Sequence, residues 1–554
     1  MPETAASKLL HTPSRWRRIA GGTAVLLAVT TALMGAGVQG AQASTAKAAV
    51  STAAGSLAPH AGVGTGTAHA ANVRTLAAAP QVKAAPQTAA QLAALARAAR
   101  PALPSRPTTG SKPVPAAGTH TTGANSSSKV SNSVRPLVAP AVVSNFDGVN
   151  FSLGGCGCQP PDVNAAVGVN EITQMVNTRL EVYSKTGAAL CGISLNSFLG
   201  TADTLADPRV MYDNVNNRYL FALTVVPASG TATPAFWVGA TQTSNPCGGW
   251  WIFRPTVSGG SFPAGTLLDY PILGQDQNAM LLSTSNFTPS AGENFTVFAI
   301  AKSALYSGGG FSFTAFTTAS QTAPATNGGI PMIATTFDYF LGAVPGTGYR
   351  LYRMTNSGGA GATLTLQATI SSTFAAPPRR VNQPGTTTTL DPLDGRIDWS
   401  PVNDGSFLWF AHGIAIGSFP GVRYGAISLS GNTATVALAY RSGTSDDFNP
   451  SVGVGNSPSG GNFIYVNWAY TDAPAGVATS DTVDSVVPGG GVPNLIATGT
   501  VLVNGSSTGE TRFGDFSSVA IDPTNVNGSC AVAAQQYFAS DGTWSTRIAR
   551  LGTC

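Results

Sequence analysis

The stretch LADPRVMYDNVNNRYLFALTVV, from Leu205 to Val226, decides the fold. After Asp207 comes a short apolar strand, then the turn DNVNN at 213–217, then a longer strand rich in aromatic and β-branched residues. Asn and Asp favour such turns because their side chains hydrogen-bond to nearby backbone and tolerate positive φ. The stretch therefore predicts a β-hairpin that is opened by an aspartate.

The same plan recurs along the chain. The aspartates that open these units are Asp162, Asp207, Asp269, Asp398, Asp447 and Asp515. A degenerate seventh copy is expected near 331–334, with its second strand around 338–341. The copies stand roughly 45 to 70 residues apart, which is the length of a four-stranded propeller blade or somewhat more. We predict an all-β fold, a β-propeller of six or seven four-stranded blades, with seven favoured. The residues at 143–149 would add a strand to the last blade and close the ring.

The first 140 residues differ in composition from the rest. Four basic residues, Lys8, Arg15, Arg17 and Arg18, precede an apolar run at 19–34 and the small-x-small site at 41–43. This is the layout of a cleaved secretory signal peptide, with a retained membrane anchor as the alternative. Residues 1–43 are therefore assigned to a signal peptide, 44–140 to a disordered Ala/Pro/Thr/Ser-rich linker, and 141–554 to the propeller. We expect a secreted protein with no stable membrane span after cleavage.

Composition narrows the class of partner. Charged residues make up 10% of the chain and the formal net charge is +4, whereas soluble domains carry roughly a quarter charged residues. The sequence contains no stripe of basic residues, which argues against a nucleic-acid partner. Gly, Ser, Thr and Asn dominate instead, and tryptophans occur at 250, 251, 399, 409, 468 and 544. A glycan or cell-surface polymer is the expected partner, and the oligomeric state stays open.

The six cysteines all follow residue 150 and fit an oxidising compartment. Cys530 and Cys554 flank the final hairpin and are predicted to pair. Cys156, Cys158, Cys191 and Cys247 belong to the first two blades and could form two more bridges, although six cysteines allow 15 connectivities. Metal binding through 156–158 is the alternative, but its spacing is too tight for a usual zinc knuckle.

Three motifs carry a resemblance to a known family. They are PPDVN at 160–164 with VGVN at 167–170, DPRVMYD at 207–213, and RFGDFSS at 512–518. In these motifs the chain resembles a family of exported bacterial β-propeller-like proteins, which implies a propeller fold and export. The opening aspartates also resemble the inner-strand Asp of propeller glycosidases and of sialidase-like propellers.

The aspartates are the sharpest candidates for chemistry. If they converge on one rim of the central channel, Asp207 with Asp162, Asp398 or Asp515 could serve a glycoside hydrolase, which needs paired carboxylates. The alternative, which repetition in nearly every blade favours, is that each Asp caps the start of its strand by accepting backbone N–H bonds. No Glu stands at a blade opening to serve as the acid.

Other chemistries find less support in the sequence. A sialidase would need three arginines to converge, and Arg179, Arg209, Arg350, Arg396 and Arg512 are the candidates. His412, the single His after residue 150, lies in an apolar strand and reads as a packed residue. No cofactor is expected, with calcium held by the turns at 213–214 or 403–404 as an alternative.

Three functions follow from these observations. The first is an extracellular binding module for a glycan, cell-wall polymer or protein partner. The second is a glycoside hydrolase that uses the inner-strand aspartates, and the third is a structural surface protein without a specific ligand. Whether the protein is an enzyme stays uncertain, with the balance against it.

Overall fold

The computed structural model describes residues 55–62, 68–83, 91, 105, 110–113, 139–155 and 158–554, apart from 260–261, 290–291, 311, 328–334, 336, 360, 457–461, 487–491 and 526–527. All of these residues belong to one unit, 49–554. The signal peptide expected at 1–43 lies outside the described residues.

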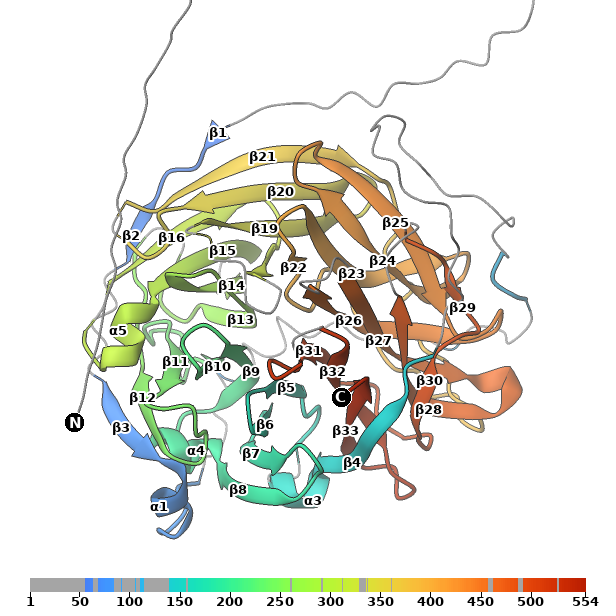
Figure 1. Cartoon of the computed structure of the whole chain (residues 1–554), viewed down its shortest axis with the longest axis horizontal. Helices are drawn as coiled ribbons and strands as arrows, with labels where there is room; N and C mark the ends of the chain where they lie inside the picture. Colours follow the sequence, from blue (N-terminus) through green and yellow to red (C-terminus); the bar gives the residue numbers. More distant parts are fainter. Residues whose placement is uncertain are drawn as a thin grey trace, which may run out of the picture. The chain divides into compact units, whose positions relative to one another are not determined.

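The unit is a seven-bladed β-propeller, with the blades set around a central axis (Figure 1). Blade 1 contains β5 (Asn164–Val167), β6 (Glu171–Val176), β7 (Arg179–Ser184) and β8 (Ala189–Ser194). Blade 2 contains β9 (Leu205–Asp213), β10 (Arg218–Val225), β11 (Phe236–Thr241) and β12 (Gly249–Phe253). Blade 3 contains β13 (Leu267–Gln275), β14 (Ala279–Thr288), β15 (Gly292–Ala301) and β16 (Phe313–Thr318).

The remaining blades follow the same antiparallel order. Blade 4 contains β17 (Ala323–Pro324), β19 (Phe337–Val344), β20 (Gly348–Thr355) and β21 (Thr363–Ser371). Blade 5 contains β22 (Val402–Asn403), β23 (Phe407–Ile416), β24 (Phe419–Ser428) and β25 (Thr433–Tyr440). Blade 6 contains β26 (Asp446–Asn456), β27 (Asn462–Asp472), β28 (Val477–Val486) and β30 (Thr500–Asn504). Blade 7 contains β31 (Ser518–Ile521), β32 (Cys530–Phe538), β33 (Trp544–Gly552) and β4 (Val142–Asn150).

Two short strands join neighbouring blades. The strand β18 (Thr326–Asn327) runs parallel to the inner strands β13 and β22, and so links blades 3 and 5 into one hydrogen-bonded sheet. The strand β29 (Leu495–Ile496) runs parallel to the outer strand β25 of blade 5. The inner strand of blade 4, β17, is two residues long, as is β22 of blade 5. Of the degenerate seventh copy, 331–334 lie outside the described residues, while 338–341 fall in β19 as expected.

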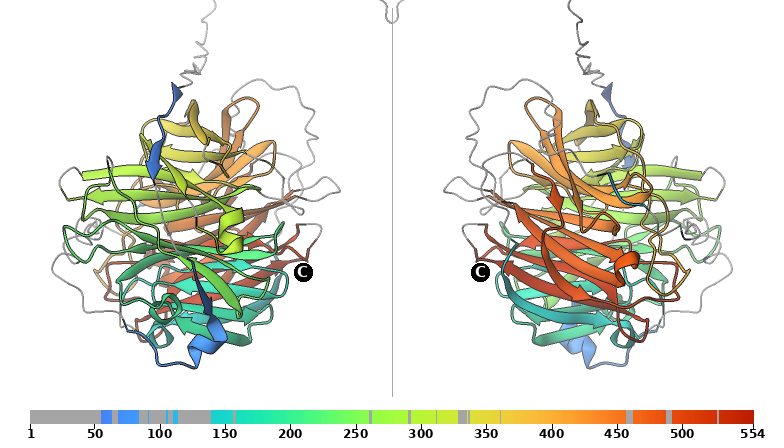
Figure 2. Two further views of the ribbon diagram at one scale, coloured as in Figure 1. Left: turned by 90° about the vertical axis from the view of Figure 1, so that its left-hand side faces the viewer. Right: turned by 90° about the vertical axis from the view of Figure 1, so that its right-hand side faces the viewer.

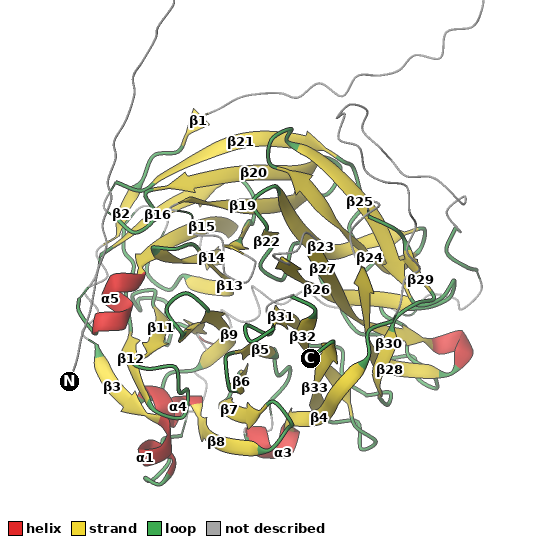
Figure 3. Ribbon diagram, in the orientation of Figure 1, coloured by secondary structure: helices red, strands yellow, loops and turns green. Residues whose placement is uncertain are grey.

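Helices are few and lie at the periphery (Figure 3). They are α1 (Val73–Ala77), α3 (Phe151–Gly154), α4 (Leu195–Leu199), α5 (Lys302–Ser307) and the 3₁₀ turn η1 (Ala473–Ala475). In the described part of the chain, no helix combines the length and the apolar character that a membrane span requires.

The core lies between the faces of neighbouring blades. One cluster joins blades 1 and 2 through Phe198, Phe221 and Trp250, whose rings contact one another at centroid distances of 5.6 and 5.7 Å. Strands that are buried on both faces are apolar along their whole length, which explains the near-continuous hydrophobic run at 219–226. Of the six tryptophans named above, Trp250, Trp409, Trp468 and Trp544 are buried in this core.

Closure of the ring is as the sequence predicts. The strand β4 pairs antiparallel with β33, with Phe146 opposite Ile548 and Asn145 opposite Ala549. The N-terminal strand thereby becomes the outer strand of blade 7. Blade 7 therefore combines strands from both ends of the propeller segment, so that neither end of the segment is left free to separate from the ring.

The segment assigned to the linker also contributes to the blades. Three strands, β1 (Gly55–Ser56), β2 (His60–Gly62) and β3 (His69–Asn72), each add a fifth strand to the outside of one blade. They pair with β21, β16 and β12, so the chain passes blades 4, 3 and 2 in that order (Figure 2). Ala71 and Val73 are buried against blade 2. For these residues the expectation of a disordered linker is wrong, because paired backbone and apolar side chains offset the ordering entropy.

Two disulfides join described residues. Cys530–Cys554 pins the end of the last strand, as predicted. Cys191–Cys247 ties the outer strand of blade 1 to the loop before β12 in blade 2. Cys158 is also disulfide-bonded, and Cys156 lies outside the described residues.

Candidate functional site

The aspartates predicted as site residues come together at one end of the inner strands. The backbone N–H of Asp515 donates to Asp162 Oδ1 at 2.7 Å, and the N–H of Tyr270 donates to Asp207 Oδ2 at 3.0 Å. The hydroxyl of Tyr270 lies 3.0 Å from Asp398 Oδ1 and 3.2 Å from the carbonyl oxygen of Asp515. We call this group the rim cluster; its members are Asp162, Asp207, Asp269, Asp398, Asp515, Tyr270, Arg209, Arg396 and Arg512.

A repeated β-bulge positions several of these side chains. In β9, β13 and β26 the pairing register shifts where an X-Pro dipeptide faces one residue of the next strand. The residue before Pro is Asp207, Tyr270 or Asn449, with φ of 56°, 55° and 51°. Proline fits a bulge because it has no N–H to donate to the ladder. Asp207 therefore corresponds to Tyr270 and not to Asp269.

These residues link neighbouring blades. Asp207 accepts the N–H of Tyr270 in the next blade, and Asn449 Nδ2 donates to the carbonyl oxygen of Gly514 at 2.8 Å. Asn177 bridges blades 1 and 2, because its Nδ2 donates to Asp162 and its Oδ1 accepts the N–H of Asp207. The capping alternative holds for Asp162 and Asp207, but the N–H groups that they accept belong to adjacent blades.

Three arginines converge on the cluster. Arg209 is 1% exposed, donates from Nη2 to the carbonyl oxygen of Asp398 at 2.5 Å, and stacks over the Phe516 ring at 3.8 Å. Arg396 lies 4.5 Å from the ring centroid of Tyr270 and is held by both carboxylate oxygens of Asp394. Both guanidinium groups are thus engaged within the protein.

Arg512 is the most open of the three. Its Nη2 lies 2.9 Å from Asp515 Oδ1, and 37% of its side chain is exposed. Of the other two arginines among the sequence candidates, Arg179 pairs with Glu181 at 2.7 Å and Arg350 donates to the carbonyl oxygen of Ala319. Neither of these contacts belongs to the rim cluster.

Burial and mutual repulsion change the acidity of the cluster. Burial, followed by the charges of Asp269 and Asp515, raises the pKa of Asp207 well above its usual value. Burial raises the pKa of Asp269 to about 6, and its carboxyl group hydrogen-bonds to that of Asp207. Burial also raises the pKa values of Asp162 and Asp398. Burial and mutual repulsion therefore favour a protonated carboxyl in the Asp207–Asp269 pair.

A long loop walls one side of the cluster. Residues 372–401 join blade 4 to blade 5 and reach across to blades 6 and 7. Asn382 N–H donates to Asp446 Oδ2 at 2.7 Å, and Asp391 N–H donates to the carbonyl oxygen of Thr511 at 3.1 Å. The same loop carries Arg396 and Asp398. The hydrogen bonds to Asp446 and Thr511 fix the loop in position, and the loop in turn holds Arg396 and Asp398 against Tyr270.

Below the cluster, the inner strands line a pocket that is partly open to solvent. Its walls are mainly small and apolar, with Trp399 and Gln275 among the exceptions; they include Ala165–Val167, Val210–Tyr212, Gly453–Val454 and Val519–Ile521. Arg209 also packs on Trp399, at 5.5 Å from its ring. Trp399, one of the aromatics noted in the sequence, therefore contributes to the central channel.

The remaining sequence candidates lie away from the rim. Asp447 pairs with Lys112 and Trp468. His412 is buried between Tyr349 and the carbonyl oxygen of Gly395, and burial lowers its pKa to about 3, so it stays neutral. In the candidate calcium turns, Asp213 and Asp404 accept backbone N–H groups of their own turns. Among the described residues, no group of three or more His, Cys, Asp or Glu side chains is arranged to hold a metal ion.

No family model matches this chain, and neither does any curated protein. Solved glycosidases are similar to it. The GH93 α-L-arabinofuranosidase of Fusarium graminearum is 10% identical over 75% of this chain and 98% of its own, with a TM-score of 0.32. The GH43_1 enzyme from Xanthomonas citri is 12% identical over 61% and 91%, with a TM-score of 0.27.

A third similar structure is the phage phi92 endosialidase, which is 9% identical over 71% of this chain and 67% of its own, with a TM-score of 0.33. Similarity at this level assigns no activity to the chain.

Sequence reasoning missed Tyr270 and gave Arg209 no special place. Aligning the repeats on Pro208, Pro271 and Pro450, instead of on the leading Asp, would have placed Tyr270 opposite Asp207. That alignment would have pointed to Tyr270 as a rim residue. No comparable pattern in the sequence indicates that Arg209, in blade 2, contacts residues of blades 5 and 7, because these contacts cross the central channel.

Proposed function

We propose that the protein is an extracellular module that binds a neutral or cationic glycan at the rim cluster. The observation that carries the proposal is the open edge of this cluster: Asp269 and Arg512 are part-exposed, while Asp162, Asp207 and Asp398 beneath them are buried. Carboxylate oxygens accept, and a guanidinium donates, the hydrogen bonds that sugar hydroxyls require.

Charge favours this class of glycan over acidic ones. The three guanidinium groups of the rim cluster are already engaged: Arg209 donates to the carbonyl oxygen of Asp398, Arg396 pairs with Asp394, and Arg512 pairs with Asp515. Arg512 would have to give up Asp515 to bind a ligand carboxylate. A polyanionic sugar would therefore have to displace Asp515 from Arg512, whereas a hydroxyl or ammonium group can bond to the carboxyl oxygens directly.

The test is a binding screen of the full chain against soluble polysaccharides of three kinds: neutral, cationic such as chitosan, and anionic such as polygalacturonate. We expect saturable binding to a neutral or cationic polymer, and a loss of at least tenfold in affinity in Asp269→Asn. Asp541→Asn is the matched control, because Asp541 is fully exposed in the β32–β33 turn. Binding that persists in Asp269→Asn, or that is confined to anionic polymers, would contradict the proposal.

Glycoside hydrolysis is the second candidate, and the raised pKa of Asp269 favours it. A part-exposed carboxyl with a pKa of about 6 is suited to donate a proton to a leaving oxygen. Its partner is less suited, because Asp207 hydrogen-bonds to Asp269 directly, whereas the two carboxyl groups of a glycosidase stand about 5 Å or more apart to flank the bond. Released reducing sugar that disappears in both Asp269→Asn and Asp207→Asn would establish hydrolysis; binding without release would leave recognition alone.

A further inference from the structure

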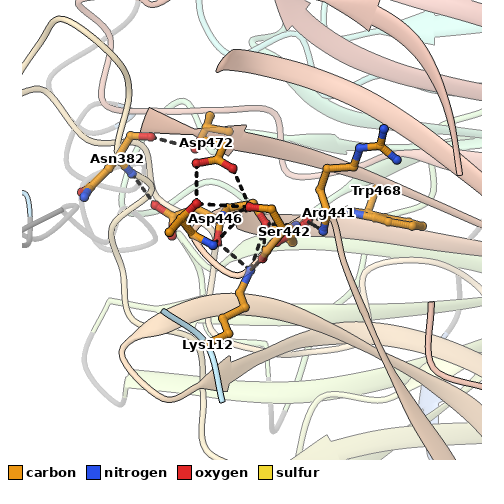
Figure 4. A network of polar contacts seen from close by, with 11 residues as sticks. Lys112, Asn382, Arg441, Ser442, Asp446, Trp468 and Asp472 are labelled. Atoms are coloured by element: carbon orange, nitrogen blue, oxygen red, sulfur yellow. Dashed lines mark hydrogen bonds and ion pairs between the residues drawn. The ribbon is translucent and has the colours of Figure 1, made fainter. Parts of the chain in front are cut away.

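The side chain of Lys112 lies fully buried in the propeller, far in sequence from the residues that it contacts. It points into the loop that joins β25 to β26, between blades 5 and 6 (Figure 4). The residues around it are Ser442, Ser445, Asp447, Phe419 and Tyr440, which we call the lysine pocket. None of them belongs to the rim cluster.

Every hydrogen of the ammonium group has an acceptor. Nζ lies 2.6 Å from the carbonyl oxygen of Ser445, 2.5 Å from Asp447 Oδ2, 3.1 Å from Ser445 Oγ and 3.4 Å from the carbonyl oxygen of Ser442. A lysine ammonium has three donors and no acceptor, so this set satisfies it completely. The side chains of Lys112 and Asp447 are both 0% exposed.

Residues of the propeller hold the carboxylate of the pocket by hydrogen bonds that do not involve Lys112. Trp468 Nε1 and the N–H of Arg441 donate to Asp447 Oδ1 at 3.0 and 2.7 Å, and Ser445 Oγ donates to Asp447 Oδ2 at 2.6 Å. These bonds come from the propeller itself and fix the carboxylate in place.

Two rings complete the lysine pocket. Nζ lies 4.8 Å from the centroid of Tyr440 and 5.6 Å from that of Phe419, within the range of cation–π attraction. Carboxylate, carbonyls and ring faces around a compact space suit a primary ammonium, whereas the planar, five-donor guanidinium of arginine would leave donors unsatisfied.

The backbone of the same segment is also bound. The N–H of Lys112 donates to the carbonyl oxygen of Gly443 at 2.7 Å. A peptide could present the same backbone donor and the same side chain. The contact therefore has the two parts of peptide recognition, one for the main chain and one for the side chain.

We propose that the lysine pocket is a binding site for a lysine side chain carried on an extended peptide, filled in this chain by Lys112. The bound lysine acts as a latch that holds the N-terminal extension to blades 5 and 6. The ligand class is a primary alkylammonium, and the occupant is residues 110–113 of the same chain.

Chemical rescue tests the site. Lys112→Ala removes the side chain beyond Cβ, which corresponds to propylammonium. We expect this variant of the full chain to melt about 5 °C or more below the wild type, and millimolar propylammonium to restore at least half of the loss with a saturable dose response. Propan-1-ol, which has the same shape without the charge, should restore none of it. Absence of rescue, or equal rescue by propan-1-ol, would overturn the proposal.

Two further variants give the specificity. Adding Asp447→Asn to Lys112→Ala should abolish rescue, because the carboxylate partner is then missing. Lys112→Arg should melt below the wild type despite its retained charge. Rescue that survives Asp447→Asn, or full stability in Lys112→Arg, would count against an ammonium-selective site.

A measurement on the unmutated chain covers the case in which these variants fail to fold. Amine-reactive labelling at pH 8, followed by peptide mapping, compares Lys112 with Lys83, which is exposed. We expect Lys112 to react at least tenfold more slowly than Lys83 in the native protein and equally fast after denaturation. Equal rates in the native protein would show that the pocket is not occupied in solution.

Discussion

Tyr270 is the residue on which the rim cluster depends. Its backbone N–H binds Asp207, its hydroxyl lies between Asp398 and Asp515, and the edge of its ring packs on Phe516 at 4.8 Å. It is 4% exposed and adopts a φ of 55°, which is unusual for a bulky residue. Four blades thus contribute to the surroundings of one side chain.

Tyr270→Phe tests this role. The change removes the hydroxyl and leaves the buried carboxyl of Asp398 without that donor, so we expect a loss of about 1–3 kcal/mol in the free energy of unfolding. Tyr537→Phe is the control, because the Tyr537 hydroxyl bonds to the exposed Asp147 and should contribute little. Denaturant unfolding measures both variants. Equal losses in the free energy of unfolding would contradict a special role for the Tyr270 hydroxyl.

The acidity of the rim cluster predicts how stability depends on pH. The pKa of Asp269 is about 6 in the folded protein and about 4 in an unfolded chain. Between these values Asp269 binds a proton in the folded protein and not in the unfolded chain, so its contribution to the free energy of unfolding should fall as pH rises from about 4.5 to 7. Asp162, Asp207 and Asp398 act in the same direction, because their pKa values are also raised.

The measurement is the urea midpoint across this range, in the wild type and in Asp269→Asn. We expect the wild-type midpoint to fall relative to that of the variant as pH rises, because the variant cannot ionise at that position. His412 opposes this trend in both proteins over the same range, because burial lowers its folded pKa to about 3, so the comparison is the difference between the wild type and the variant. A wild-type midpoint that does not fall relative to that of Asp269→Asn between pH 4.5 and 7 would contradict the assignment.

At the level of elements, the X-Pro bulge is the unit that repeats. It turns one residue of each of three inner strands toward the axis at positive φ and leaves the rest of the strand free to pair. The bulge places Asp207 and Tyr270 in the rim cluster, and it recurs in β26 at Asn449. The chemistry at each position can then differ, as Asp207, Tyr270 and Asn449 do.

Bonds between blades add to these contacts. The disulfide Cys191–Cys247 closes a separation of 56 residues and joins blades 1 and 2. Replacing both cysteines by Ala should cost about 4 kcal/mol in the chain-entropy estimate. The corresponding change at Cys530–Cys554, with a separation of 24, should cost less, about 3 kcal/mol. Thermal and denaturant unfolding of the two double variants gives the comparison, and the reverse order would show that loop length does not govern the effect.

At the level of the whole molecule, closure by β4 is the contact whose loss should matter most. Deleting residues 141–152 removes the outer strand of blade 7, including the buried Val149, and reopens the ring. We expect the melting temperature to fall by more than about 10 °C. Deleting 55–62, which removes only the short strands β1 and β2, should have a much smaller effect. Similar falls in melting temperature for the two deletions would contradict the prediction that ring closure by β4 contributes most to stability.

The sequence by itself determined the propeller, its repeat, the closing strand and the Cys530–Cys554 bridge. Hairpin patterns and repeat length are local properties, and they survive without knowledge of long-range contacts. It also identified all five rim aspartates as residues that open repeats, and four of them as candidates for chemistry.

The tertiary structure decided what those residues do. Only packing brings Tyr270 and three arginines to the same aspartates, sets the protons that they share, and places Lys112 against Asp447, 335 positions away. The strands at 55–72 were missed for the same reason: their composition is that of a linker, and their order comes from the edges of blades to which they pair. Long-range contacts of this kind leave no period in the sequence, because each is made once, between surfaces that exist only after the blades have formed.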